Sequence, residues 1–457
     1  MKTLIRWFMV LAALVAALGS FQALAEEDTQ AKAFAEGRTV QLPPYIVLEQ
    51  AGSHWRYVSA PNLEVISKCE DWETAEFVEA FITQDRKLAE ILPDFLRMNR
   101  SIPMTIILIT PEMARDMRKQ MAEAMRDKLV AQQVGLSRLS MFEIIPQMVL
   151  WDNESVSMMF EFDGGDYSTM SFMPDHIQQL LDKRVPKLPT WFKQGMSTIY
   201  RELHWKDGMI GFPTSSWPIS KTSDRRGRLT IPEAVLPMQE FLDGPWSGKD
   251  QDSSRHYELW CLQADLFLRW ALDDKSHARR EALWKFVDRS SRELATEALF
   301  KQCLGLGFSD MEKELANFIP KARMLKIEAF DADSVKSPNL SVIRDATAGE
   351  VGWIKGSFDL KEIAYVEKNR LPYADKYIGQ AEADLTGPYR KGVRDPEFLA
   401  VLGLYYSEVG KNDLALPILE QAVAAHIAWP HVYIELARIR KADVSAKPSV
   451  SHLASDP

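Results

Sequence analysis

The stretch MTIILITPEMARDMRKQMAEAM, residues 104–125, decides the fold class of this chain. Residues 104–110 are apolar without alternation and lie between Pro103 and Pro111, a pattern that predicts a strand covered on both faces. The residues from Pro111 onward predict a helix, because proline is tolerated at the first helical position. A covered strand that leads directly into a helix indicates a domain that mixes α and β elements.

Methionines recur every four residues along this predicted helix, at Met113, Met117, Met121 and Met125. This spacing places them along one helix face. Such a stripe can form an adaptable binding surface, and it can also belong to an ordinary core. We expect core packing.

The segments before this stretch predict a small sheet and another helix. Extended patterns occur at 45–50 (YIVLEQ), 55–60 (WRYVSA) and 62–65 (NLEV). Residues 71–92 predict a helix with one apolar face, which comprises Phe77, Phe81, Leu88 and Leu92. The predicted sheet therefore begins well before the covered strand.

Residues 1–25, MKTLIRWFMVLAALVAALGSFQALA, have the pattern of a secretory signal peptide. Two basic residues, Lys2 and Arg6, precede an apolar run over 7–18, and Ala-Leu-Ala at 23–25 matches a cleavage site of small residues. The run is too short for the roughly 30 Å hydrocarbon layer of a membrane, so we expect secretion rather than a transmembrane anchor. We expect the mature protein to be periplasmic.

Composition and charge narrow the possible functions. Hydrophobic residues make up 46% and charged residues 26% of the chain, values typical of soluble globular proteins. The chain has 55 basic and 64 acidic residues, and loss of Lys2 and Arg6 with the signal peptide would leave 53 and 64, a net charge of −11. An acidic protein of this kind is a poor binder of nucleic acid. No later segment is long and apolar enough to span a membrane, so we expect no transmembrane span.

The three cysteines, Cys69, Cys261 and Cys303, are widely separated and form no CxxC pattern. Their odd number and spacing argue against a disulfide framework and against a structural zinc site. We expect at least one of these thiols to be buried. The sequence leaves open the alternative of one long-range disulfide between two of the cysteines.

Three further segments complete the middle of the chain. Residues 157–172 (SMMFEFDGGDYSTMSF) predict a hairpin around the turn sequence Asp-Gly-Gly-Asp at 163–166. From about 232 to 323 the pattern is helical, which predicts an all-helical second unit. Residues 324–355 are mixed and polar, and they predict a linker or a small extended connection.

The C-terminal part contains a repeat. With Pro396 as the first position, residues of the required sizes follow at Leu402, Gly403, Tyr406, Ala415 and Ala422. The pattern restarts 34 residues later at Pro430, with Leu436 and Ala437. This pattern resembles the tetratricopeptide repeat, which implies helical hairpins whose small residues let two helices approach closely. A more degenerate unit precedes it, with Ala374, Ile378 and Ala381 in its second helix.

The stretch DHIQQLLDKRVPKLPTWFKQGMSTIY, residues 175–200, raises the question of a metal site. A histidine opens one predicted helix, and Leu-Pro-Thr-Trp-Phe at 188–192 opens a second helix in which Gly195 follows Gln194. With the hairpin before it and the helices after it, the order of elements resembles the gluzincin zinc metallopeptidases over residues 41 to about 323. In that family one helix carries HExxH, and the next begins Pro-x-Trp-x-x-Glu-Gly-x-Ala.

Most of the chemical groups of that family are missing. The resemblance places the first His on His176, the general-base Glu on Ile177, the second His on Leu180 and the third ligand, a Glu, on Gln194. A catalytic zinc ion needs about three protein ligands and a water, with a carboxylate to accept the proton of that water. Since one imidazole cannot meet this need, we expect no catalytic residues, no bound metal and no cofactor.

The resemblance also implies a cleft that a peptide could occupy by strand addition. Its candidate residues are His176, Trp191, Gln194, Glu202, His204 and Tyr257. Leu188, Pro189, Phe192, Gly195 and Tyr200 keep the scaffold of the second helix. Asp175, Glu202 and His204 leave a rebuilt zinc site open, with Glu202 about two turns beyond Gln194.

These observations predict an α+β protein, a gluzincin-like sheet-and-helix unit followed by helical units. The expected segments are a signal peptide (1–25), the gluzincin-like unit (41–205), a helical unit (206–323), a linker (324–355), tetratricopeptide-like helices (356–442) and a flexible tail (443–457). We expect a non-catalytic, metallopeptidase-like protein that binds a protein or peptide through its cleft or its C-terminal repeats. The alternatives are an active zinc peptidase with an atypical site, and an assembly scaffold whose larger domain is purely structural.

Overall fold

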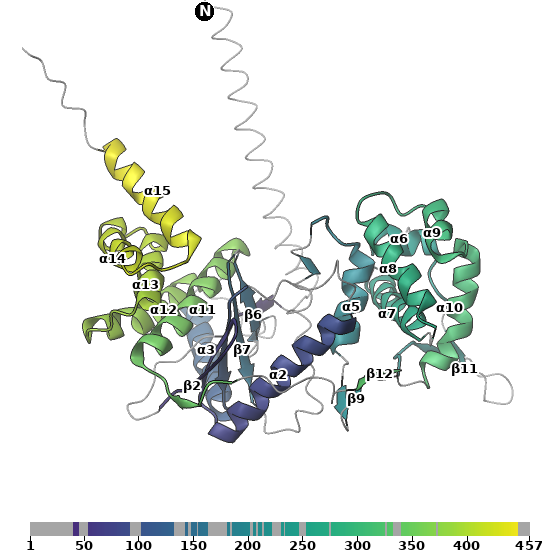
Figure 1. The fold of residues 1–457 in the computed structure, drawn as a ribbon, viewed down its shortest axis with the longest axis horizontal. Helices are drawn as coiled ribbons and strands as arrows, with labels where there is room; N and C mark the ends of the chain where they lie inside the picture. Colours follow the sequence, from purple (N-terminus) through teal and green to yellow (C-terminus); the bar gives the residue numbers. More distant parts are fainter. Residues whose placement is uncertain are drawn as a thin grey trace, which may run out of the picture.

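The computed structural model covers a large part of the chain. It describes residues 40–44, 54–91, 102–131, 142–144, 148–152, 154–162, 181–182, 185–201, 204–206, 209–212, 214–221, 230–232, 234–245, 253–273, 276–324, 327–331, 340–371 and 373–446. These residues form both helices and strands, so the predicted α+β class is confirmed. Along the longest axis a sheet lies in the middle, with the helices between 348 and 446 at one end and those between 238 and 322 at the other (Figure 1).

A six-stranded sheet forms the centre of the fold. In spatial order its strands are β13 (Arg344–Asp345), β2 (Arg56–Ala60), β3 (Leu63–Ser67), β4 (Met104–Ile109), β7 (Val156–Glu161) and β6 (Met148–Trp151). The central strands β3, β4 and β7 run parallel, whereas β13, β2 and β6 are joined by antiparallel pairings. The strand that was predicted to be covered on both faces is β4, at the centre of the sheet.

Helix α2 (Asp71–Ile91) covers one face of this sheet. Its Phe77 and Phe81 pack against Phe160 of β7, with ring centroids 5.2 Å and 6.3 Å apart. Both phenylalanines were predicted to lie on the buried face of this helix, and both are buried. The alternate side chains of β4 that point to this face, such as Leu108, join the same core.

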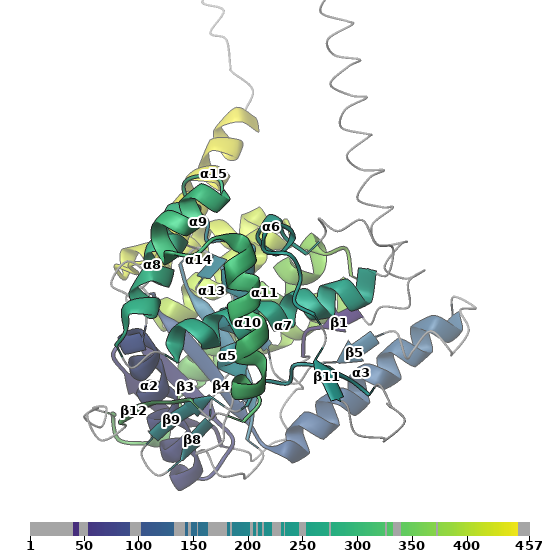
Figure 2. The same ribbon diagram turned by 90° about the vertical axis from the view of Figure 1, so that its right-hand side faces the viewer.

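Helices α3 (Pro111–Ala131) and α11 (Ala348–Lys368) cover the opposite face. Figure 2 shows α2 and α3 on opposite sides of β3 and β4. Met117 and Met121 of α3 are buried in one core with Ile107 of β4. These two methionines are therefore ordinary core residues and not a binding stripe.

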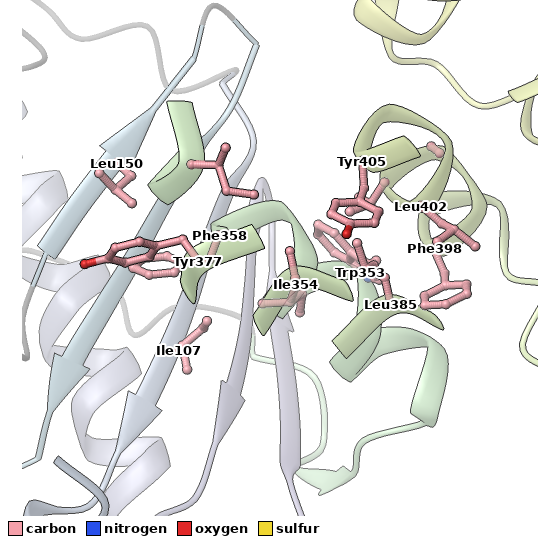
Figure 3. Packing of buried hydrophobic residues seen from close by; sticks show 14 of the residues in the cluster. Ile107, Leu150, Trp353, Ile354, Phe358, Tyr377, Leu385, Phe398, Leu402 and Tyr405 are labelled. Atoms are coloured by element: carbon pink, nitrogen blue, oxygen red, sulfur yellow. The ribbon is translucent and has the colours of Figure 1, made fainter. Parts of the chain in front are cut away.

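The C-terminal helices pack onto α11. They are α12 (Ala374–Arg390), α13 (Pro396–Glu408), α14 (Asn412–Ala424) and α15 (Pro430–Ala446). Helix α11 pairs with α12, α13 pairs with α14, and α13 also contacts α11, α12 and α15. Figure 3 shows the resulting core, which runs from Ile107 and Leu150 of the sheet through Phe358 of α11 to Phe398 and Leu402 of α13. The sheet and the C-terminal helices therefore share one hydrophobic core.

The residues predicted to pack inside the repeat lie in this core. Leu402, Ala415 and Ala422 are fully buried, and Tyr406 is partly buried against the same cluster. A Cβ atom at Gly403 would lie 2.5 Å from Cδ2 of Leu419, so only glycine allows α13 and α14 to approach this closely.

A second helical unit lies at the other end of the molecule. Its helices are α5 (Thr190–Arg201), α6 (Met238–Asp243), α7 (Ser253–Leu272), α8 (Ala278–Ser290), α9 (Glu297–Leu304) and α10 (Phe308–Ala322). Their buried faces form a separate core that is rich in tryptophan and phenylalanine. The helical pattern predicted from about 232 to 323 is therefore present from Met238 onward.

Short strands precede these helices, so the prediction of an all-helical unit from residue 206 is wrong at its start. The strands are β8 (His204–Lys206), β9 (Met209–Phe212), β10 (Ile219–Lys221) and β11 (Thr230–Pro232). β12 (Ile327–Asp331) joins β9 and β8 in a three-stranded sheet, while β10 and β11 pair with each other. The sequence contained a usable signal for the β8–β9 hairpin, the Asp-Gly pair at 207–208.

The segment at 324–355, predicted as a linker or a small extended connection, contains two short strands and the start of a helix. Within it, β12 pairs with β9, β13 pairs with β2, and α11 begins at Ala348. A capping box between Thr347 and Glu350 starts α11, since each side chain bonds the backbone N–H of the other residue. The segment looked like a linker because its strands are short and pair only with distant parts of the chain.

The first arm of the hairpin predicted at 157–172 pairs with strands other than the predicted second arm. Its first arm is β7, which pairs with β4 on one side and with the preceding strand β6 on the other. Asp152 closes the β6–β7 turn by accepting hydrogen bonds from the backbone N–H groups of Glu154 and Ser155 at 2.7 Å and 2.8 Å. The predicted second arm lies outside the described residues. One further strand pair, β1 (Val40–Leu42) with β5 (Phe142–Ile144), is parallel.

Candidate functional site

Helix α5 carries the part of the predicted site that the structure describes. It packs along α7 at Gly195, where a Cβ atom would lie 2.6 Å from the backbone oxygen of Ala264 and 2.7 Å from Cδ1 of Leu268. Glycine is required here because any side chain would push the two helices apart. The Gly after the third-ligand position therefore has a packing role in this chain.

Trp191, predicted to line the cleft, is a core residue instead. Only 1% of it is exposed, and its ring lies 5.3 to 5.9 Å from the rings of Phe241, Phe267 and Phe286. Its Nε1 is buried and donates no hydrogen bond. The tryptophan faces inward because it fills the contact between α5 and the helices around it, so it cannot contact a ligand.

Gln194, at the predicted third-ligand position, is half-buried and engaged with its own helix. Its Nε2 donates to Oγ1 of Thr198 at 3.4 Å, and that hydroxyl donates to the backbone oxygen of Gln194 at 3.1 Å. A neutral amide in this arrangement offers one carbonyl oxygen and no negative charge. It is therefore a far weaker zinc ligand than a carboxylate.

The other candidate cleft residues are not brought together with Gln194 in the described part of the chain. His176, Ile177, Leu180 and Glu202 lie outside the described residues. His204 lies in β8, opposite Gly211 of β9. Tyr257 lies near the start of α7, is 40% exposed, and stacks on Trp260 at 6.1 Å.

The geometry of α5 and α7 separates Tyr257 from Gln194. Gly195 meets Ala264, and Tyr257 precedes Ala264 by seven residues, which corresponds to about 10 Å along a helix. Tyr257 therefore lies about two turns of α7 before the contact of α7 with Gly195.

A histidine that the sequence reasoning missed lies beside Tyr257. Nδ1 of His256 is 3.4 Å from Oε1 of Glu240 on α6, and its buried Nε2 has no hydrogen-bond partner. One imidazole and one carboxylate are fewer ligands than a catalytic zinc ion requires. Within the described residues, no three His, Cys, Asp or Glu side chains are arranged to hold a metal ion.

The interior of the second helical unit holds a buried ion pair. Nε of Arg269 lies 2.8 Å from each carboxylate oxygen of Asp265, and both side chains are almost completely buried. Oγ of Ser215 also donates to Asp265, at 3.4 Å. The pair is enclosed by α7 and its neighbours, so it stabilises the fold and is not available to a substrate.

Comparison of the chain with models of protein families, with curated proteins and with solved structures found no match. Of the helices that the structure describes, none is both long enough and apolar enough to cross a membrane. The class that the fold defines is therefore a mixed α and β protein with a central six-stranded sheet and two helical units.

Proposed function

We propose that this chain is a secreted, periplasmic and non-catalytic relative of the gluzincin metallopeptidases that binds a protein partner through tetratricopeptide-like C-terminal helices. The sequence supports secretion through its signal-peptide pattern. The loss of catalysis is supported by the neutral Gln194 and by Leu180 at two ligand positions of that family, and by Ile177 at the position of its general base.

The observation that carries the proposal is a difference between equivalent positions of two repeats. Tyr433 and Ile434 of α15 lie 34 residues after Leu399 and Ala400 of α13. Leu399 and Ala400 are buried, at 4% and 0% exposure, whereas Tyr433 and Ile434 are 44% and 64% exposed. The face that neighbouring helices cover on α13 is thus open on α15.

The surroundings of this open face suit a protein partner. Leu414 of α14 is a further large apolar side chain in the same region of the chain, 44% exposed. Charged pairs lie beside the apolar residues, including Arg438 with Glu435 and Arg440 with Glu420. In helix-in-groove recognition, a helix packs its apolar face against an apolar surface of the partner, and polar groups surround the contact. We therefore infer that the partner presents an apolar helix to α15.

Site-specific photocrosslinking tests this proposal with the full chain expressed in the periplasm. A crosslinking amino acid at position 434 should give one discrete adduct, whereas the same amino acid at the exposed Leu294 should give none. Ile434→Ser should weaken co-purification of the crosslinked partner at least tenfold, while Leu294→Ser leaves it unchanged. Equal adducts at both positions, or none at 434, would contradict the proposal.

The structure changes how a scaffold role should be tested. A truncation near residue 350 would remove α11, whose Ile354 and Phe358 are part of the core shared with the sheet. The loss of binding by such a truncation would report unfolding. Point variants on α15 avoid this problem because Tyr433 and Ile434 contribute little to the core.

The non-catalytic part of the proposal is tested by metal analysis. The purified chain should contain far less than one zinc per molecule and should cleave no peptide in a chelator-sensitive manner. A near-stoichiometric zinc content that disappears in His176→Ala would support the alternative, an active peptidase with an atypical site.

A further inference from the structure

Helix α11 is buried on nearly all sides, yet it carries four buried charged side chains. These are Lys355, Asp359, Lys361 and Glu362. The helix is enclosed because the sheet lies on one side and α12 and α13 lie on the other (Figure 3). Charged groups are almost never fully buried unless they are paired, so each of these four needs an explanation.

The two lysines have partners. Nζ of Lys361 lies 3.1 Å from Oδ2 of Asp152 in the β6–β7 turn. Nζ of Lys355 lies 2.7 Å from Oδ1 of Asp384 on α12, and the other oxygen of Asp384 accepts from Nε2 of Gln380 at 2.8 Å. Asp384 is therefore the carboxylate that pairs directly with Lys355.

The two carboxyl groups have no such partner. Asp359 and Glu362 follow Lys355 by four and seven residues, so all three share one face of α11. Both acids are completely buried, and none of their four oxygen atoms accepts a hydrogen bond. We call Lys355, Asp359, Glu362, Gln380 and Asp384 the acidic seam.

The charges of the acidic seam do not balance if every group is ionised. It holds one cation, Lys355, and three carboxyl groups, Asp359, Glu362 and Asp384, which leaves an excess of two negative charges. Other titratable groups on the elements around α11 include Tyr57, Glu64, Asp152, Tyr377, Glu397 and Tyr405. The two cations of α12, Lys376 and Arg390, are exposed and therefore lie outside the acidic seam, and Lys361 is already paired with Asp152.

Protonation of the two acids removes this excess. Burial raises the pKa of Asp359 and of Glu362 well above the ordinary range. The negative charge of Asp384 raises the pKa of Asp359 further, and the positive charge of Lys355 opposes this in part. The negative charges of Asp359 and Asp384 raise the pKa of Glu362 further. An ionised carboxylate in the same place would lose its hydration without compensation, which costs several kcal/mol.

We propose that the acidic seam is a proton-dependent joint between α11 and α12: the helices stay packed while Asp359 and Glu362 carry protons, and loss of these protons at alkaline pH loosens α12 from α11. This inference is independent of the proposed function, because it concerns the attachment of the C-terminal helices and not what they bind.

The sign of the pH dependence follows from proton counting. In the unfolded chain Asp and Glu ionise near pH 4, so opening the joint at neutral pH releases up to two protons. A state that holds more protons is favoured at low pH. The packed state is therefore most stable below about pH 4 and becomes less stable as pH rises toward the raised pKa values. Each released proton increases the opening equilibrium constant about tenfold per pH unit.

Hydrogen exchange of the full chain between about pH 6 and 9 tests the proposal, after correction for the intrinsic exchange rate. Opening of residues 374–390 should increase with pH in the native sequence, by up to about 100-fold per pH unit. Asp359→Asn/Glu362→Gln keeps shape and removes both titrations, so it should abolish this slope and slow exchange at the alkaline end. Glu314→Gln/Asp413→Asn, which changes two exposed acids, is the matched control and should keep the slope.

Two results would overturn the proposal. One is an opening constant of the native sequence that does not change with pH. The other is the same slope in Asp359→Asn/Glu362→Gln as in the native sequence. If this double variant does not fold, proton release on unfolding of the native chain near pH 7 decides: release of about two protons supports the joint, and the absence of proton release contradicts it.

Discussion

The Cα atom of Gly195 faces the backbone oxygen of Ala264 so closely that an added Cβ atom would lie only 2.6 Å from that oxygen. This contact sets the distance between α5 and α7, and it lies next to Gln194. The helix predicted to carry a metal ligand is thus held in place by backbone packing, which needs neither a metal ion nor a substrate.

Gly195→Ala should destabilise the second helical unit. The added methyl group would meet backbone atoms that cannot move aside, and overpacking of this kind costs about 1–3 kcal/mol. Gly379→Ala is the matched control, because Gly379 also lies in a helix and its Cβ position meets no atom within 4 Å. It should stabilise α12 by roughly 0.5–1 kcal/mol. Thermal unfolding should show a lower melting temperature for Gly195→Ala and a higher one for Gly379→Ala. Equal shifts of the melting temperature in the two variants would be inconsistent with this packing.

Arg269→Met should be strongly destabilising. It leaves the buried carboxylate of Asp265 without its main partner, a change that typically costs about 3–5 kcal/mol. Asp265→Leu/Arg269→Met removes both charges and should be more stable than Arg269→Met alone. Urea denaturation of the single and double variants gives the coupling energy, and additive losses would show that the pair is not coupled.

Thr347→Ala should lower stability by about 1 kcal/mol through loss of the capping box at the start of α11. Thr347→Ser keeps the hydroxyl and should stay near the native value. Melting temperatures of the two variants provide the measurement. A loss of equal size in Thr347→Ser would point to the methyl group rather than the cap.

Native alkylation at pH 8 should distinguish the three thiols. Burial raises the pKa of Cys69 to about 12, so roughly 10⁻⁴ of this thiol is ionised at pH 8. Cys261 is half-buried and should react first, while Cys69 should react only after unfolding. Mass spectrometry of the labelled peptides before and after denaturation provides the readout. Labelling of Cys69 as fast as Cys261 in the native chain would rule out this burial.

Several elements could be predicted from the sequence because their signals are local. Pro111, Pro396 and Pro430 each begin a helix, as their missing N–H groups allow. The unbroken apolar run at 104–110 became the central strand β4 because helices cover both faces of the sheet. Such signals need no information about the rest of the chain.

The part of the fold that was wrong depends on contacts between distant residues. β13 consists of two exposed residues, Arg344 and Asp345, that pair with β2. α11 is buried around most of its circumference, so its apolar residues show no single face, and its first residues up to 355 were assigned to the linker. The charges are tolerated because Asp152 and Asp384 come from other elements.

Some features of the candidate site could likewise be predicted from the sequence, and others could not. The resemblance alone predicted a ligand position at Gln194, whereas the burial of Trp191 could not be predicted, because a tryptophan near a helix start can face a cleft or a core. The contact of His256 with Glu240 of α6 could not be predicted either, since Glu240 lies 16 residues earlier in the sequence.

The sequence by itself determined which segments are strands and helices where apolar runs and prolines act locally, and it carries the resemblance that predicts the loss of a general base at 177 and of two ligands at 180 and 194. Only the tertiary structure decided that α11 joins the sheet to the C-terminal helices and that Asp384 of α12 pairs with Lys355 close to the buried Asp359. The physical reason is that a charge's environment depends on the groups that surround it in space, and α11 obtains those groups from a strand turn and a helix that are distant in sequence.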